Sequence, residues 1–383
     1  MYNELESFVR NWYDSKEFIP LHAPVFFGNE KKYLNECIDS TFVSYVGQYV
    51  NQFEDSIAQY TGSKRAIATV NGTAALHIAL VALGVKEGDE VITQPLTFVA
   101  TANAISYVKA SPVFVDVDEQ TLGLSYQALK GFLESNVSVQ NGVAINKLTQ
   151  NRITACIPMH TFGFPCEIEE IVELCHQYGI AVIEDAAESL GSFKSGKHTG
   201  TFGEIGILSF NGNKTITSGG GGMVITNDEK LADKIKYLTT TAKAPHPYEF
   251  FHDEVGYNYR MTNLNAAVGL AQMECLDEIL ANKRSLAKAY QSFFEDIEDL
   301  QFRTEPKGTN ANYWLNTIQL SSFEKREEFL KSMNERGVMC RPVWTLMNKL
   351  PMYKNAQTTN LPISEKLSNS LVNLPSSIQS RRS

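Results

Sequence analysis

The sequence predicts an α/β fold in which a large domain is followed by a smaller one. From residue 64 onward, short apolar segments alternate with helical ones, as in a parallel sheet covered by helices. A chain of 383 residues is long enough for a large domain and a second, smaller one. Two later segments, 312–320 and 338–344, alternate like strands of a small α+β domain. We therefore expect an N-terminal arm and a large domain with a mostly parallel central sheet over 1–250, and a small domain over 251–383.

Composition excludes several classes of protein. Hydrophobic residues make up 43% of the chain and charged residues 20%, which is typical of a globular protein, and the formal net charge of -9 argues against a nucleic-acid partner. The six cysteines form no CxxC pair or metal-ligand cluster, so we read them as reduced thiols. No apolar run reaches the ~20 residues of a membrane helix, and the acidic N-terminus does not resemble a signal peptide. We expect a cytoplasmic protein without a metal or membrane partner.

Hydrophobic periodicity and turn residues place the remaining elements. Helices are predicted over 1–20, 29–40, 52–60, 74–83, 100–107, 126–134, 168–178 and 229–239, and through most of 262–300. Strands are predicted over 66–70, 91–93, 112–115, 153–157, 180–183, 205–210 and 223–226. The polar segment 135–151 and the aromatic-rich segment 246–260 fit neither period.

The stretch between the last two of these strands holds the strongest chemical signal. Lys214 stands there alone before four consecutive glycines, with Ser209 five residues earlier and Asp185 at the end of an upstream strand. A lysine beside glycines is most often an ordinary solvated side chain. The three together are what pyridoxal 5′-phosphate needs: a carboxylate for the pyridine nitrogen, a hydroxyl for the phosphate, and an amine that carries the aldehyde as a Schiff base.

A second feature of this kind is the turn that leads into helix 74–83. Gly72, Thr73 and Ala74 follow a short strand, and a small-residue turn at a helix N-terminus presents N–H groups and a hydroxyl to an anion. Most turns of this type only cap a helix. Beside Asp185 and Lys214 the phosphate interpretation is favoured, so these three residues join the predicted cofactor site.

With these residues in view, the chain resembles the DegT/DnrJ/EryC1/StrS sugar aminotransferases over nearly its whole length. This family lies within the fold-type I, aspartate-aminotransferase-like superfamily. Each matching segment is weak alone, but the five stand in the family's order. They are residues 71–76 (NGTAAL), 95–98 (PLTF), 184–188 (EDAAE), 209–214 (SFNGNK) and 256–261 (GYNYRM).

The resemblance implies roles for individual residues. Lys214 carries the cofactor and moves the α-proton, and Asp185 keeps the ring nitrogen protonated. Phe98 lies flat on the pyridine ring, and Asn258 contacts the cofactor phosphate of the neighbouring subunit in a homodimer. Glu188 departs from the His or Gln common near the ring's phenolic oxygen, and a carboxylate fits there only if it is protonated or paired.

Four further residues keep two interpretations each. His160, at the end of strand 153–157, either is a structural histidine or acts near the substrate. Trp314, Arg341 and Trp344 either contact a nucleotide or sugar or serve packing, and packing is the default for both tryptophans. The family usually continues beyond residues 373–377 with a final helix, whereas this chain carries a short basic tail over 378–383.

The resemblance also implies the reaction. We expect an aminotransferase that converts a nucleotide-linked 4-keto-6-deoxy sugar, of the UDP-2-acetamido type found on legionaminic-acid-like pathways, to the 4-amino sugar with glutamate as donor, for surface polysaccharide. A sugar 3-dehydratase of the same family is an alternative, although those relatives replace the lysine by histidine. A catalytically silent sugar-sensing relative is another. The nucleotide, the C2 substituent and the choice between C3 and C4 remain open.

Overall fold

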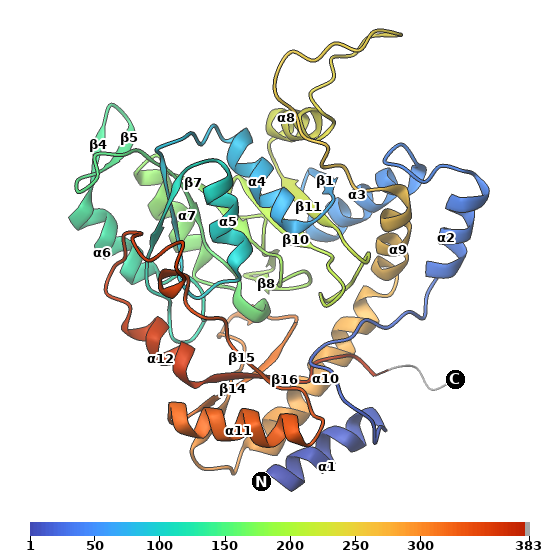
Figure 1. The fold of residues 1–383 in the computed structure, drawn as a ribbon, viewed down its shortest axis with the longest axis vertical. Helices are drawn as coiled ribbons and strands as arrows, with labels where there is room; N and C mark the ends of the chain where they lie inside the picture. Colours follow the sequence, from blue (N-terminus) through green and yellow to red (C-terminus); the bar gives the residue numbers. More distant parts are fainter. Residues whose placement is uncertain (380–383) are drawn as a thin grey trace.

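The computed structural model describes residues 1–379, and the large domain is built on a seven-stranded sheet. Helices lie around this sheet (Figure 1). Its strand order is β1-β11-β10-β7-β6-β2-β3, and every strand except β11 runs in the same direction. The strands are β1 (Arg65–Thr69), β2 (Glu90–Thr93), β3 (Ser111–Phe114), β6 (Ile153–Ile157), β7 (Ala181–Asp185), β10 (Ile205–Ser209) and β11 (Gly222–Thr226). The mostly parallel central sheet is thereby confirmed.

Helices cover both faces of this sheet, which explains why apolar residues predominate in its strands and are buried on both sides. One face packs against α4 (Gly72–Ala82), α5 (Val99–Tyr107) and α8 (Glu229–Thr239). The other packs against α3 (Gln48–Thr61) and α9 (Asn263–Met273) at one end, and against α6 (Tyr126–Asn136) and α7 (Ile168–Gln177) at the other. Polar side chains cap the first turn of several of these helices, namely Asn71, Ser125, Asp228 and Thr262.

The smaller α+β unit contains an antiparallel sheet of order β12-β14-β16-β15. Its elements are α10 (Leu276–Phe294), β12 (Leu300–Phe302), β14 (Asn316–Leu320), α11 (Phe323–Glu335), β15 (Arg341–Pro342), α12 (Pro362–Ser370) and β16 (Leu371–Leu374). Helix α1 (Tyr2–Tyr13) packs against α11, whereas α9 packs against α3 and α2 (Glu30–Asp39). The division into 1–250 and 251–383 stays a prediction.

Several element boundaries predicted from the sequence were wrong. The N-terminal helix ends at Tyr13, where Asp14 adopts a left-handed conformation, and not near residue 20. The segment 135–151 extends α6 and then forms a hairpin of β4 (Val137–Gln140) and β5 (Val143–Asn146). The strand predicted over 312–320 begins only at Asn316, because the residues before it run into the large domain. Of 338–344, only Arg341 and Pro342 pair in the sheet.

Three short strands pair outside both main sheets, in the order β13-β8-β9, and two single-turn helices complete the described elements. These are β8 (Phe193–Lys194), β9 (Lys197–His198), β13 (Thr309–Asn310), η1 (Thr161–Gly163) and η2 (Met347–Lys349). No helix within residues 1–379 is long and apolar enough to cross a membrane. Of the basic tail, residues 380–383 lie outside the described part of the chain.

Candidate active site

A cavity of about 390 Å³ lies where β1, β7 and β10 end. The carboxyl ends of neighbouring parallel strands share one edge of a sheet, and ligands of open α/β sheets bind there. The structure brings most of the predicted site residues to this cavity: Gly72, Thr73, Phe98, Asp185, Glu188, Ser209 and Lys214 line it. Ala74 and Asn258 are not among the lining residues.

Lys214 extends its amine between a carboxylate and an aromatic face. Its Nζ lies 3.3 Å from Oε1 of Glu188 and 4.1 Å from the centroid of the Trp314 ring. The Lys214 side chain is 13% exposed, so protein surrounds most of it while the amine still opens onto the cavity. A primary amine in this setting can bind an aldehyde and can carry a proton.

Glu188 is paired with Lys214, as we expected of a carboxylate at this position of the site. Its second oxygen, Oε2, accepts a hydrogen bond of 2.9 Å from the N–H of Phe162, while Oε1 faces Lys214. Burial raises the pKa of Glu188 to about 7, against the lowering effects of Lys214 and the Phe162 N–H. The carboxyl group can therefore gain or lose a proton near neutral pH.

Asp185 occupies the end of β7, and the pleat of the strand separates it from its neighbour Glu184. Glu184 points away from the cavity and accepts hydrogen bonds from backbone N–H groups at residues 200, 202 and 203. Asp185 instead lines the cavity, and its Oδ2 accepts a 2.7 Å hydrogen bond from the hydroxyl of Thr101. Burial raises the pKa of Asp185 above its ordinary value, against the lowering effects of the Thr101 hydroxyl and the Ala187 N–H.

An anion cradle forms at the N-terminus of α4. The Asn71 side chain accepts from the N–H of Ala74 at 2.7 Å, so that particular N–H is already engaged in capping the helix. Gly72 approaches strand β10 closely, and a Cβ atom at this position would lie 3.2 Å from Cβ of Ser209. The absence of a side chain thus lets the Ser209 hydroxyl stand beside the first turn of the helix, where N–H groups point at a ligand.

The four residues left with two interpretations divide between the cavity and the scaffold. Trp314 and Trp344 line the cavity, and the Trp344 ring centroid lies 6.4 Å from that of Phe98. Arg341 is exposed in β15 and is not a lining residue. His160 is buried behind the cavity and is described next.

His160 supports the end of β7 and does not reach the cavity. Its Nε2 lies 2.9 Å from Oε2 of Glu184, and its backbone N–H donates to the carbonyl of Asp185. Burial alone would lower the pKa of His160, but contacts with Cys166 and Glu184 raise it above the ordinary value. Nδ1 of His160 accepts a 3.2 Å hydrogen bond from the backbone N–H of Cys166, so the ring joins Cys166 to Glu184 and holds the strand end that carries Asp185.

Sequence reasoning missed Thr101, which holds the Asp185 carboxylate. It stands in the first turn of α5, four residues after Thr97, which lies just before the helix, and the two hydroxyl oxygens are 3.0 Å apart. This i, i+4 spacing was visible in the sequence and could have suggested the pair. Sequence reasoning also missed Asn312, which reaches the Glu188 carbonyl from the smaller unit. No spacing or motif around Asn312 indicates this contact.

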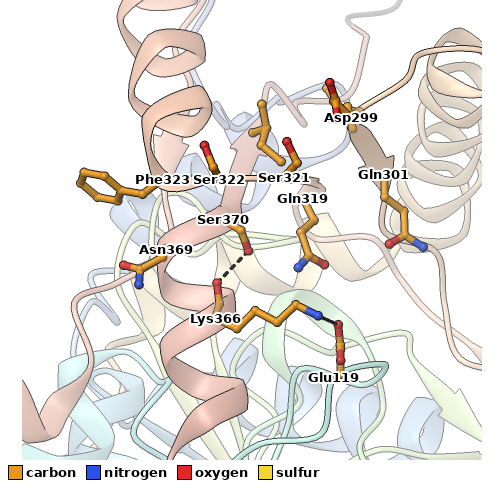
Figure 2. Close-up of a pocket in the computed structure, with 12 residues that line it drawn as sticks. Glu119, Asp299, Gln301, Gln319, Ser321, Ser322, Phe323, Lys366, Asn369 and Ser370 are labelled. Atoms are coloured by element: carbon orange, nitrogen blue, oxygen red, sulfur yellow. Dashed lines mark hydrogen bonds and ion pairs between the residues drawn. The ribbon is translucent and has the colours of Figure 1, made fainter.

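A larger cavity, of about 480 Å³, lies away from these residues (Figure 2). It is lined by Glu119, by both strands β12 and β14, and by α12, and Lys366 there forms an ion pair with Glu119. None of the predicted site residues lines it. Within residues 1–379, no group of three or more His, Cys, Asp or Glu could hold a metal ion. Size alone therefore does not mark the reactive site.

The smaller cavity fits pyridoxal 5′-phosphate on its donor set alone. It offers an amine at Lys214 for the aldehyde, a buried carboxyl at Asp185 for the ring nitrogen, and a helix N-terminus with Ser209 for the phosphate. A doubly wound sheet with this set at its carboxyl edge defines the class of fold-type I pyridoxal-phosphate enzymes.

Comparison with known proteins gives the family. Residues 27–381 match the model of the DegT/DnrJ/EryC1/StrS aminotransferase family, so the chain belongs to that family. A GDP-perosamine synthase of Escherichia coli O157:H7 is 41% identical over 360 residues, which are 94% of this chain and 93% of the relative.

Two solved structures extend the likeness. The aminotransferase TlmJ from Streptoalloteichus hindustanus superposes with a TM-score of 0.85 at 25% identity, covering 96% of this chain and 95% of its own. DesV of S. venezuelae, solved in complex with a ketimine intermediate, has a TM-score of 0.80 at 25% identity, covering 91% and 88%. The chain is an aminotransferase that uses pyridoxal phosphate.

Proposed function

We propose that this enzyme transfers the amino group of glutamate to C4 of a nucleotide-linked 4-keto-6-deoxy sugar, for surface polysaccharide or nonulosonic-acid biosynthesis. The observation that carries the proposal is the site itself, in which Lys214 faces Glu188 with Asp185 and Ser209 on the same cavity. The relative named GDP-perosamine synthase supports a nucleotide sugar as the amino acceptor.

The residues of the chain divide the work of the reaction. When bound, pyridoxal phosphate supplies an aldehyde and a ring that accepts electrons. The Lys214 amine holds that aldehyde at rest and, once released from it, takes the α-proton of the amino donor. Glu188, at 3.3 Å, balances the charge that this proton gives to Lys214. Asp185, held by Thr101, keeps a proton on the ring nitrogen.

The nucleotide distinguishes two versions of this proposal. The sequence resemblance favoured a UDP-linked 2-acetamido sugar, whereas the curated relative is named for a GDP-linked one. We give priority to the GDP substrate. The purified enzyme would be assayed with glutamate against GDP-, UDP- and dTDP-linked 4-keto-6-deoxy sugars, and products would be identified by mass spectrometry and NMR. Amination of the GDP sugar at C4 is expected. Amination of none of the three would refute the proposed reaction.

The same assay separates the two other candidate functions. A 3-dehydratase would release a product that lacks an oxygen at C3 and retains no new nitrogen. A silent sugar-binding relative would bind nucleotide sugar without consuming glutamate. The presence of Lys214, paired with a carboxylate at the cavity, favours transamination over both.

We further propose that two copies of the chain share their active sites. Asn258 is exposed and lies outside its own chain's cavity, which suits a residue that serves a neighbour. Large apolar side chains are exposed on two segments, at Phe42 and Val46 and, on the loop that projects beyond α8 in Figure 1, at Tyr248 and Phe250. Exposed apolar groups of this size are typical of interaction surfaces.

A mixing experiment tests the sharing. Lys214→Ala and Asn258→Ala subunits, each nearly inactive alone, are unfolded together and reassembled. If the residues act in one site across the interface, half of the dimers are mixed and each has one intact site, so activity returns to about a quarter of the wild-type value. If Asn258 serves its own subunit, every site retains one defect. Mixed dimers without recovered activity would therefore contradict the proposal.

A further inference from the structure

We infer that Trp314 is a positioning residue, which holds the free amine of Lys214 beside Glu188 during turnover. This inference rests on the proposed role of Lys214. Trp314 enters the site from the segment that precedes β14, whereas Lys214 follows β10 in the large domain. The smaller unit thus supplies one wall of the space in which the reactive amine moves.

The contact is direct and has a defined geometry. The ammonium nitrogen of Lys214 stands 4.1 Å from the centroid of the Trp314 ring. A cation at this distance from an indole face is attracted by the negative potential of the ring, and tryptophan is the strongest of the aromatic residues in this respect. With Glu188 at 3.3 Å, the amine has one anionic and one aromatic partner.

Trp314 is itself fixed on every polar atom. Its indole N–H donates to the carbonyl of Asn213 at 2.7 Å, the residue immediately before Lys214. Its backbone N–H donates to the side chain of Asn312 at 2.8 Å, and its carbonyl accepts from Lys283 at 3.1 Å. The residue is only 4% exposed. The ring therefore aligns both the backbone that carries the lysine and the lysine's far end.

Asn312 anchors this segment to the large domain. Its amide nitrogen donates to the carbonyls of Glu188 and Leu190, each at 2.9 Å, and to the hydroxyl of Thr215. The next residue, Tyr313, adopts a positive φ of 47°, a conformation that costs free energy for a residue with a side chain. A strained turn held by so many bonds indicates that the path of the chain through residues 312–314 is tightly specified.

Such confinement matters because a lysine side chain has four rotatable bonds. An unconfined amine would spend much of its time away from the reacting carbon, and effective concentration falls accordingly. The two walls formed by Trp314 and Glu188 restrict the amine to the cavity that would hold the cofactor aldehyde.

Two variants and one matched control test this role. Trp314→Phe keeps an aromatic face but removes the hydrogen bond to Asn213 and weakens the ring potential. Trp314→Leu removes both. Trp12→Phe in α1 is the control, because it also replaces one tryptophan and the Trp12 indole nitrogen has no hydrogen-bond partner within residues 1–379. Thermal melting of each full-length variant reports whether the fold is retained.

Two readouts are measured on the full chain freed of cofactor. One is the rate at which Lys214 binds added pyridoxal phosphate, followed by absorbance and confirmed by borohydride reduction and peptide mapping. The other is acetylation of Lys214 relative to exposed Lys331 in the same sample. We expect binding of the aldehyde to slow roughly threefold in Trp314→Phe and roughly tenfold in Trp314→Leu, with faster acetylation because the amine is released from its walls.

In the loaded enzyme, kcat should fall by similar factors while KM for the sugar changes little. Equal rates of aldehyde binding and of acetylation in wild type and Trp314→Phe would overturn the inference, whether or not Trp314→Leu folds. If borohydride instead attaches the cofactor to a different lysine in the wild-type chain, the proposed function fails. The acetylation ratio of Lys214 would still report the contact with Trp314, so the two failures are distinguishable.

Discussion

Two lysines contact Trp314, Lys214 at its ring and Lys283 at its backbone carbonyl, and they differ in nearly every other respect. Lys214 lies over its ring, faces the carboxylate of Glu188 and opens onto the cavity. Lys283, on α10, is 1% exposed and donates to the Trp314 carbonyl, to the Ser376 carbonyl and to Nε2 of His22. The first lysine has an acidic partner and space to move, and the second has only neutral partners and no space.

The difference shows how one residue type serves chemistry or structure according to its surroundings. Burial without an acidic partner lowers the pKa of Lys283 to about 7, and the same burial lowers the pKa of His22 well below its ordinary range. Their contact joins the N-terminal arm to the smaller unit. Lys214 has an anion and a polarisable ring instead, which suit an amine that must be available for reaction. The predictions below test this contrast.

The largest expected effect comes from replacing each of the two lysines separately and comparing the turnover of the two variants. Lys214→Ala should lower turnover by at least about a thousandfold, because it removes both the cofactor's covalent partner and the group that moves the proton. Lys283→Met should stay within about tenfold of wild type, since Lys283 does not line the cavity and touches Trp314 only at its backbone carbonyl. Absorbance of bound cofactor and steady-state kinetics measure both. Comparable losses in the two variants would remove the distinction.

The next effect concerns the carboxylate on the far side of the cavity. Asp185→Asn keeps the shape of the side chain and its hydrogen bond from Thr101, so the protein should fold and bind cofactor. Turnover should nevertheless fall by roughly a hundredfold or more, because a neutral amide does not keep the ring nitrogen protonated. Single-turnover rates with glutamate measure the loss. Turnover near the wild-type value would mean that Asp185 has another role.

Stability should reveal the buried lysine. The pKa of Lys283 falls from 10.5 to about 7 on folding, so between these values the unfolded chain binds more protons and stability rises with pH. From pH 7 to pH 9 this contribution is roughly 2 to 3 kcal/mol, because one pKa unit corresponds to about 1.36 kcal/mol and the folded lysine is already half deprotonated at pH 7. Relative to wild type, Lys283→Met should lack this rise when unfolding is followed in urea at both pH values. Parallel profiles would show that Lys283 titrates normally.

The contrast between these lysines also explains what the sequence could predict. Lys214 and Asp185 follow apolar strands, and strand ends in a parallel sheet converge on one edge, so their meeting in one cavity was expected from local pattern alone. The family's order of segments gave the fold class, and the central sheet confirms it. The roles assigned to these residues remain predictions.

What local pattern could not predict depends on distant segments. Trp314 reaches Asn213 across 101 residues of sequence, and Lys283 reaches Ser376 across 93. In the sequence, Lys283 is indistinguishable from any solvated lysine on a long helix. Its burial follows from the path of the N-terminal arm and of the residues after β16, neither of which leaves a periodic signal on α10.

The smallest expected effect concerns Glu188, the acidic partner that Lys214 has and Lys283 does not. Folding raises the pKa of Glu188 from 4.5 to about 7, chiefly through burial, so between these values the folded chain binds more protons than the unfolded one. Its contribution to stability is complete below pH 4.5 and is lost as pH rises through 7. Over pH 5 to 6.5 the loss is about 2 kcal/mol. In the cofactor-free chain, Glu188→Gln should lack this decline when urea unfolding is compared at the two pH values. A decline of equal size in the variant would show that Glu188 ionises as an ordinary glutamate, and its pairing with Lys214 would then be a normal ion pair with no reserve of protons near neutral pH.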